Sequence, residues 1–334
     1  MNKPFLLKAV GKDYLWGGNR LNDDFSKNID IQPLAESWEC STHPSGLSLV
    51  NSGRYTGEIL RDVLKNNPEF LGKHPRETMK ANGLEEFNLP ILIKLIDAKS
   101  NLSIQVHPND NYAKEHENGQ LGKTEMWYVL DATKDAQLIY GLRQDMTKEE
   151  VQTALTQGTF EECLNRVHIQ KNDVFMIPAG TIHAICAGAL VAEIQENSDL
   201  TYRLYDYDRI DKNGKKRKLH IEKALDVSNL NVVGKPSQPM RVLNFRPGIA
   251  QELLCRCKYF QVERLLLNTE RIRKLSSVHA DSMSFVVLLC VGGCGMFEFD
   301  DEKLPFFKGD CLFIPADSVE VRLHGKAEFL KVNC

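Results

Sequence analysis

Much of this chain consists of short apolar segments separated by turn residues. The first series lies between residues 90 and 207 and comprises PILIKLID, LSIQVH, MWYVLDA, AQLIYGL, DVFMIPA, LVAEIQE and LTYRLYDY. The second lies between residues 260 and 332 and comprises FQVERLLL, SFVVLLCV, GMFEFD, CLFIPA, VEVRL and EFLKV. Helical segments do not alternate regularly with these strands, so a parallel βαβ sheet is not expected. The sequence predicts a mainly β protein with antiparallel sheets, arranged as a sandwich or jelly roll.

A few short helices are expected as insertions. Residues 58–66 place four apolar side chains on one helical face and are followed by a proline. Residues 221–227 form another apolar helical stretch after the basic turn DKNGKKRK. Within that turn, residues 212–218 are expected to form a solvated loop.

Two more helices are predicted on either side of Gly158. Thr147 with Glu150, and Thr159 with Glu162, have the spacing of a capping box, in which two side chains satisfy the first backbone N–H groups of a helix. We therefore expect one helix to begin after Thr147 and a second to begin after Thr159.

Bulk composition excludes some classes of partner. The net charge of −3 gives no global attraction to nucleic acid or to anionic membranes. The N-terminal segment lacks the apolar run of a signal peptide, and no later stretch reaches the length of a membrane span. The nine cysteines are scattered and lack CxxC spacing, which indicates free thiols in a reducing compartment rather than a Cys-rich zinc site. The cytoplasm is the expected location, and the oligomeric state is left open.

Four side chains with metal-binding groups occur at strand-like positions. Gln105 and His107 alternate on one short strand and so point to one face, Glu125 begins the next strong strand, and His183 follows a Pro-Ala-Gly turn. Turns and strand ends can present ligands without disturbing the core. If these strands converge, the set could bind a divalent cation, and the ligands alone do not distinguish Zn²⁺ from Mn²⁺, Fe²⁺ or Co²⁺.

The chain also contains an internal repeat. KNDVFMIPAGTIHAI at residues 171–185 matches KGDCLFIPADSVEVR at residues 308–322, which indicates duplication of a β unit. Glu320 takes the place of His183 in the second copy, so only the first copy is expected to bind metal. We expect a catalytic metal-binding domain over residues 1–228 with helical insertions, and a C-terminal domain over residues 229–334 without metal ligands.

The segment NDVFMIPAGTIHAI resembles the second motif of the cupin superfamily, in which P-x-G-x-x-H supplies a metal ligand. The first motif departs from the usual cupin pattern, because Gln105-x-His107 replaces His-x-His and Glu125 follows after an insertion. That departure is typical of type I phosphomannose isomerases, and the chain resembles their short bacterial form along nearly its whole length. The matching stretches are YLWGGNRL, AESWECSTHPSG, LPILIKLIDAKSNLSIQVHPND, EHENGQLGKTEMWYVL, IPAGTIHAI and QENSDLTYRLYDYDR.

The resemblance implies two cupin-like jelly-roll barrels and an aldose–ketose isomerase that interconverts mannose 6-phosphate and fructose 6-phosphate through a cis-enediol or enediolate. It implies one Zn²⁺ ion per chain, a sugar-phosphate substrate, and no nucleic-acid or membrane partner. By matching motif, the metal ligands are Gln105, His107, Glu125 and His183. The resemblance also points to Arg203 and Lys123 as active-site residues.

Roles for these two residues follow from their chemistry. Lys123 lies two residues before Glu125 on the same strand face, so it should reach the metal and is the candidate base. Arg203 stays protonated, and we expect it to stabilise the enediolate or clamp the substrate, with Thr201 and Tyr205 on the same strand face.

The group that binds the phosphate is left open. Candidates are Lys123, Lys114, His116 and Arg203. In the N-terminal third, the Trp-Gly-Gly turn at residues 16–18 and the AESWE run at residues 35–39, with its two glutamates, are expected to be structural.

Two alternative functions are considered. Another metal-dependent cupin enzyme, such as an oxygenase, would use Fe²⁺ and more histidine ligands. A non-catalytic sugar-binding cupin would need no proton shuttle. A coupled isomerase assay with and without chelator distinguishes both from an isomerase.

Overall fold

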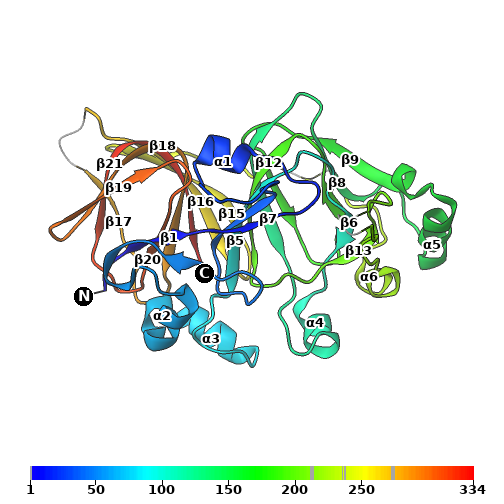
Figure 1. Cartoon of the computed structure of the whole chain (residues 1–334), viewed down its shortest axis with the longest axis horizontal. Coiled ribbons are helices and arrows are strands. Elements are labelled where there is room, and N and C mark those ends of the chain that lie inside the picture. The colour runs from blue at the N-terminus through cyan, green and yellow to red at the C-terminus, as the bar shows by residue number, and fades with distance from the viewer. Residues whose placement is uncertain (1, 211–213, 235, 237, 272–274) are drawn as a thin grey trace.

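The computed structural model describes residues 2–210, 214–234, 236, 238–271 and 275–334. Two β units lie side by side, one formed mainly by the middle of the chain and one mainly by its C-terminal part (Figure 1). All strand pairs within the sheets are antiparallel, which confirms the mainly β fold class. The strand orders describe open sheets of 10, 6 and 5 strands, so the expected barrels are not closed by hydrogen bonds.

The middle unit consists of two sheets that face each other. Its 6-stranded sheet has the order β10(Val174–Ile177), β7(Glu125–Ala132), β12(Ala189–Glu196), β5(Ile91–Asp97), β3(Glu36–Cys40) and β2(Val10–Lys12). Its 5-stranded sheet has the order β13(Tyr202–Tyr205), β6(Ile104–Val106), β11(His183–Ile185), β8(Gln137–Leu142) and β9(Leu164–His168). Buried side chains from both sheets, including Trp127, Tyr140 and Ile185, form one apolar cluster.

The C-terminal unit is a single 10-stranded sheet. It contains β14(Asn244–Arg246), β15(Ile249–Arg256), β16(Gln261–Asn268), β17(Ser276–Val278), β18(Val286–Phe299), β19(Glu302–Phe307), β20(Cys311–Ile314) and β21(Val321–Asn333). Two N-terminal strands, β1(Phe5–Lys8) and β4(Leu49–Val50), complete it, and β1 pairs with β20. The four segments expected between residues 284 and 332 outside β20 merge into the long bent strands β18 and β21. The sheet curls around buried aromatic residues such as Phe297, Phe306 and Phe329.

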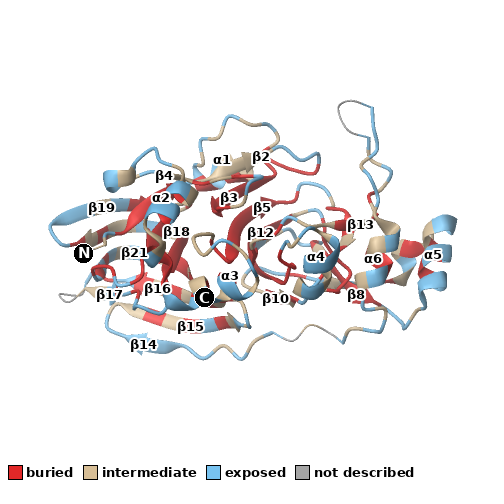
Figure 2. Cartoon of the chain, turned by 90° about the horizontal axis from the view of Figure 1, so that it is seen from below, coloured by how far each residue is buried: buried red, intermediate tan, exposed pale blue. Residues whose placement is uncertain are grey.

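Helices cover the edges of these sheets. They are α1(Arg20–Phe25), α2(Leu60–Asn66), α3(Lys73–Ala81), α4(Asp110–His116), α5(Lys148–Gln157) and α6(Ile221–Val227), with short 3₁₀ helices η1(Gly53–Tyr55), η2(Pro68–Leu71) and η3(Phe160–Cys163). Helices α2, α5 and α6 confirm three predictions, whereas α1, α3 and α4 were not predicted. Figure 2 shows that buried residues follow the strands and that exposed ones cover much of α4, α5 and the segment leading to β14.

The two capping-box predictions have different outcomes. The Thr147 hydroxyl accepts a hydrogen bond from the Glu150 N–H, and the Glu150 side chain bonds back to the Thr147 N–H. The second prediction is wrong, because the Thr159 side chain makes no capping hydrogen bond and the segment is only the 3₁₀ helix η3. The apolar residues that follow belong to strand β9 instead, where Leu164 is buried.

None of the helices in the described ranges combines the length and the apolar character needed to cross a bilayer.

The two copies of the internal repeat share the same local turn. Strands β10 and β20 each follow a turn with a left-handed residue, Asn172 (φ 74°) or Gly309 (φ 102°). In each turn an aspartate accepts a backbone N–H from three residues earlier, at 2.9 Å for Asp173 and 2.8 Å for Asp310. The same local chemistry therefore ends the hairpin in both units.

The second copy of this turn gives a test of the fold. A Cβ on Gly309 would lie 2.3 Å from the Phe25 carbonyl oxygen, in addition to the strain of its positive φ, whereas a Cβ on Gly158 (φ 74°) would meet nothing within 4 Å. We expect Gly158→Ala to cost roughly 1–2 kcal/mol of unfolding free energy. Gly309→Ala should cost clearly more, measured from urea unfolding midpoints. Equal losses in the two variants would contradict this packing.

Candidate active site

Strand register in the 5-stranded sheet brings three of the predicted site residues into one row. His183 on β11 pairs with Gln105 on β6, and Gln105 pairs with Arg203 on β13. Residues directly opposite each other on antiparallel strands project to the same face of a sheet. Residues far apart in the sequence are therefore placed together by backbone hydrogen bonds alone.

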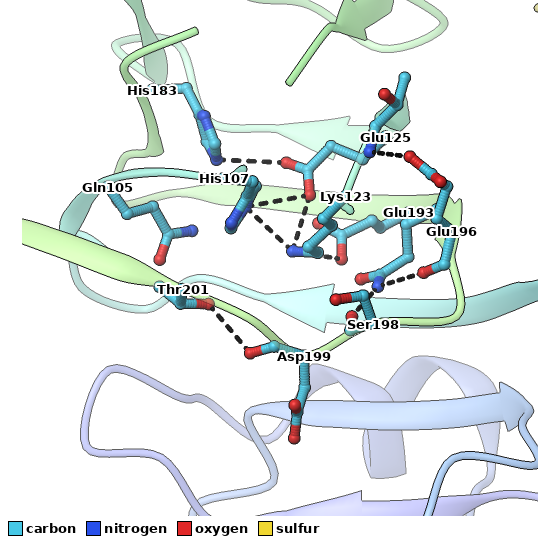
Figure 3. Close-up of polar contacts among 12 residues, drawn as sticks. Gln105, His107, Lys123, Glu125, His183, Glu193, Glu196, Ser198, Asp199 and Thr201 are labelled. Atoms are coloured by element: carbon cyan, nitrogen blue, oxygen red, sulfur yellow. Dashed lines mark hydrogen bonds and ion pairs between the residues drawn. The ribbon is translucent and has the colours of Figure 1, made fainter. Parts of the chain in front are cut away.

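His107, Glu125 and His183 form a compact buried cluster at this place. Each offers a ligand atom, and these atoms all lie within 4.8 Å of one another. Glu125 belongs to the facing 6-stranded sheet, and its carboxylate oxygens lie 3.4 Å from His107 Nε2 and 3.3 Å from His183 Nε2 (Figure 3). The cluster thus forms where the two sheets of the middle unit meet.

Backbone carbonyls orient both imidazoles. The Nδ1 of His107 lies 2.7 Å from the Leu200 carbonyl, and that of His183 lies 2.8 Å from the Thr181 carbonyl. Since a carbonyl only accepts, both Nδ1 atoms carry the hydrogen and both Nε2 atoms present a lone pair toward Glu125. Burial, followed by the Lys123 ammonium, lowers the pKa of His107 to about 3. Burial also lowers the pKa of His183, so both rings are neutral at neutral pH.

Glu125 is ionised in this setting. Burial alone would raise its pKa, but the Lys123 ammonium outweighs burial and holds the pKa of Glu125 well below its usual value. Neither of its oxygens, nor His183 Nε2, makes a hydrogen bond that satisfies the usual geometry. Two neutral imidazoles and a buried carboxylate fit the ligand requirements of a divalent metal ion.

Lys123 reaches the cluster, as the sequence predicts. Its Nζ lies 2.7 Å from Glu125 Oε2 and 3.1 Å from His107 Nε2. The single lone pair on His107 Nε2 can serve only one partner at a time. A cation bound to that nitrogen therefore requires the Lys123 ammonium to turn away, and the adjoining cavity gives it room to do so.

Gln105 lies beside the cluster without being engaged by it. Figure 3 shows its amide next to the His107 ring, and its Oε1 accepts a hydrogen bond from Ser103 at 3.3 Å. Ser103 and Gln105 thus lie on one face of this segment. One weak donor leaves the amide oxygen able to accept a further partner.

A cavity of about 190 Å³ opens next to the cluster. The predicted residues Gln105, Lys123, Thr201 and Arg203 line it. Lys114 and His116, two of the candidates for phosphate binding, lie on α4 and are not among its lining residues. Tyr205 does not share the Arg203 face either, because a bulge after Arg203 shifts the register and Tyr205 packs in a separate apolar cluster.

Several lining residues were not predicted. Lys94 and Glu193 pair directly across β5 and β12, and Lys94 Nζ lies 3.1 Å from Glu193 Oε1. Glu193 Oε1 also lies 3.8 Å from Lys123 Nζ, and its Oε2 accepts from Trp127 Nε1 at 3.0 Å. Each of these two charges interrupts an otherwise apolar strand in the sequence, which is the signal that could have identified them.

The N-terminal third contributes more than the structural role expected of it. Trp16 and Glu36 both line the cavity, and Glu36 Oε2 lies 4.0 Å from Lys94 Nζ. Glu39, on the opposite face of β3, does have a structural role, since it pairs with the buried Lys27 at 2.6 Å. The alternation of β3 thus sends one glutamate to the cavity and the other to the boundary between the two units.

Arg203 lines the same cavity. Its Nε is buried without a hydrogen-bond partner, and burial, together with the nearby Arg217, lowers its pKa. Arg217 also lines the cavity and is held by Asp206. The basic turn was expected to be solvated. This is confirmed for the exposed Lys216 but is wrong for Arg217, which is partly buried. Residues 211–213 of the turn lie outside the described residues.

Comparisons with known proteins agree with this architecture. Residues 5–161 match the family model "Phosphomannose isomerase type I, catalytic domain", and residues 251–334 match "Mannose-6-phosphate isomerase, cupin domain". Mannose-6-phosphate isomerase ManA of Bacillus subtilis is 39% identical over 98% of this chain and 97% of its own. The chain therefore belongs to the type I mannose-6-phosphate isomerase family, as the resemblance in the sequence indicates.

Solved structures show the same likeness. The crystal structure of mannose 6-phosphate isomerase from Bacillus subtilis has a TM-score of 0.88 and 35% identity, and the match covers 99% of each chain. A crystal structure of mannose 6-phosphate isomerase described as "holo; zinc bound" has a TM-score of 0.73, covers 98% of each chain and is 18% identical, a likeness of fold alone.

The buried charge pair next to the cluster gives a stability test. Glu193→Gln leaves Lys94 buried without its nearest carboxylate, and we expect a loss of about 3–5 kcal/mol of unfolding free energy. The control is Asp226→Asn, because the Lys148–Asp226 pair is about half exposed and such pairs contribute about 0–1 kcal/mol. Urea unfolding of both variants measures the difference. A loss in Glu193→Gln no larger than that of the control would show that Glu193 does not stabilise Lys94.

Proposed function

We propose that this chain interconverts mannose 6-phosphate and fructose 6-phosphate with one Zn²⁺ ion held by Gln105, His107, Glu125 and His183. The observation that carries the proposal is the convergence of the last three, whose buried ligand atoms lie within 4.8 Å of one another. Membership of the mannose-6-phosphate isomerase family supports the choice of reaction.

The ligand set suits the chemistry of an aldose–ketose exchange. A bound divalent cation would act as a Lewis acid that stabilises negative charge on the two adjacent sugar oxygens. Two neutral imidazoles, one neutral amide and one carboxylate leave such an ion with a net positive charge. Zinc is our choice among divalent metals because a structure of the same fold is described as zinc bound.

Proton transfer between C1 and C2 is the task of the chain's own residues. Lys123 is the proposed proton carrier, since its Nζ lines the cavity beside the ligand cluster. Glu193 anchors this side chain from the other side, at 3.8 Å, and itself stays fixed by Lys94 and Trp127. Lys123 can thus swing between the cluster and the cavity without leaving its counter-charge.

Arg203 is proposed to stabilise the enediolate. It lies in register with Gln105, and its guanidinium has an unused buried N–H. A donor that is already fixed before reaction stabilises developing negative charge without reorganising. Arg203 and Arg217 together make the cavity wall that best suits the phosphate of the substrate.

The division into a catalytic part, residues 1–228, and a second cupin-like part, residues 229–334, is retained as a proposal. All proposed ligands and both proposed catalytic residues belong to the first part. Because β1 pairs with β20 in the second part, we do not propose that either part folds alone.

A coupled isomerase assay on mannose 6-phosphate tests the proposed function. We expect turnover in the zinc-loaded protein, its loss after chelation and its return on adding Zn²⁺, because the ion supplies the charge stabilisation. Oxygen uptake is followed in parallel. Oxygen consumption with Fe²⁺ and no isomerisation would indicate an oxygenase, and binding of the sugar phosphate without turnover would indicate a binding protein.

The role of Lys123 has its own test. Lys123→Met should abolish turnover while metal content, measured by atomic absorption, stays at one ion per chain, because Lys123 is not a ligand. Lys134→Met, on an exposed position after β7, is the control and should behave as wild type. Near-normal activity of Lys123→Met would remove Lys123 from the mechanism.

A further inference from the structure

The segment that carries Lys123 into strand β7 is fixed almost entirely by hydrogen bonds to its backbone. Lys123 N–H donates to the Pro108 carbonyl at 3.0 Å, next to the His107 ligand. The Leu121 carbonyl accepts from the Ser198 hydroxyl at 3.0 Å. In addition to these two bonds, two carboxyl groups accept backbone N–H groups of the same segment.

Asp110 and Glu196 are these carboxyl groups. Asp110 Oδ1 accepts the Gly122 N–H at 3.1 Å, and Glu196 Oε1 accepts the Thr124 N–H at 2.7 Å (Figure 3 shows Glu196). A Cβ on Gly122 would lie 2.5 Å from the carbonyl carbon of Asn109, so the segment packs against the start of α4 with no spare room. The segment before Glu125 therefore depends on the positions of both carboxyl groups.

The two carboxyl groups lie close to each other, and each shifts the pKa of the other. Two adjacent buried carboxylates repel each other, and a proton on one of them removes this repulsion. Burial, followed by the neighbouring Asp110, raises the pKa of Glu196 to about 9, whereas Glu196 and the donors Tyr259 and Gly122 lower the pKa of Asp110 despite its burial. Glu196 is consequently the neutral partner at neutral pH, and its buried Oε2, which has no hydrogen-bond partner among the described residues, is the atom that we expect to carry the proton.

The C-terminal unit contacts this pair. The Tyr259 hydroxyl donates to Asp110 Oδ2 at 2.9 Å, and Lys258 Nζ lies 3.4 Å from the same oxygen. Both residues lie in the turn between β15 and β16. Burial and the two carboxyl groups raise the pKa of Tyr259, so its hydroxyl keeps its proton. Asp110, Lys258 and Tyr259 are the titratable groups that face Glu196 from α4 and from this turn.

We propose that Glu196 as a neutral acid, Asp110 and Tyr259 form a latch that positions the Lys123 segment for proton transfer. These are positioning residues and do not touch substrate. Through Tyr259, the C-terminal unit, which lacks the metal ligands, contributes to the site of the first unit. The kinetic consequence rests on the proposed isomerase function, whereas the protonation of the latch does not.

Ionisation of Glu196 should release the latch. Without the proton of Glu196, two buried negative charges face each other. The Thr124 segment would then separate from α4, and Lys123 would lose its position. Isomerase activity should therefore decline as pH rises through about 9, the pKa of Glu196.

Two substitutions in the zinc-loaded enzyme separate positioning from general stability. Glu196→Gln keeps an acceptor for Thr124 and a donor for Asp110 but cannot ionise, whereas Glu196→Ala loses both. At pH 7.5 we expect Glu196→Ala to lower kcat by about 10- to 100-fold with little change in KM, as for a misplaced catalytic group. Glu196→Gln should recover most of that loss and should lack the decline in kcat near pH 9. Tyr259→Phe should lower kcat less than Glu196→Ala does.

Equal kcat for the Gln and Ala variants, or the same alkaline decline in Gln as in wild type, would overturn the proposal. If the wild-type enzyme is inactive, the proposed isomerase function is refuted instead. The pH dependence of the unfolding free energy then tests the latch independently of activity. Glu196 has a raised folded pKa of about 9 against an ordinary 4.5, so its stabilising contribution is complete below about 4.5 and is lost as pH rises toward 9. Relative to Glu196→Gln, the folded-to-unfolded ratio of wild type should fall by about tenfold per pH unit in that window. A difference independent of pH contradicts the latch.

Discussion

The Glu125 carboxylate is fully buried, and the arrangement of the surrounding site follows from its charge. Neither of its oxygens makes a hydrogen bond, so compensation has to come from positive charge nearby. The chain supplies Lys123 at 2.7 Å, and two neutral imidazoles aim their lone pairs at the same place. Either the Lys123 ammonium or a bound cation can supply the positive charge that the buried Glu125 carboxylate requires. Lys123 in turn lies near Glu193, and Glu193 pairs with Lys94, so a row of buried charges extends from the cluster.

The two β units share a hairpin turn but have different tasks. In the first, the strand that follows β10, β11, begins with His183, and its register places His183 in one row with Gln105 and Arg203. In the second, Glu320 stands at the matching position and the interior is filled by aromatic side chains. The second unit keeps a role nonetheless, because its Tyr259 reaches the segment that carries the proposed proton carrier.

The sequence predicted the mainly β fold class and three residues that the structure brings together, His107, Glu125 and His183, because both follow from local patterns. Strand alternation and positions at strand ends select Gln105 and His183 as candidate ligands without knowledge of tertiary structure. Lys94 and Glu193 were not predicted, because the role of a charged residue inside an apolar strand depends on its partner. That partner is known only once the register between the two strands is known. The helix expected after Thr159 failed for a related reason, since pairing with β8 draws the following residues into strand β9. Long-range pairing overrides local spacing in both cases.

We propose that four side chains from two sheets bind one metal ion. Anomalous diffraction at the zinc absorption edge, from crystals of the zinc-loaded protein, locates that ion. We expect one strong peak per chain within about 2.0–2.2 Å of His107 Nε2, His183 Nε2 and a Glu125 oxygen, with the Gln105 amide oxygen facing it. A peak elsewhere, or full zinc content with Lys123 Nζ still bonded to His107 Nε2, would refute this arrangement.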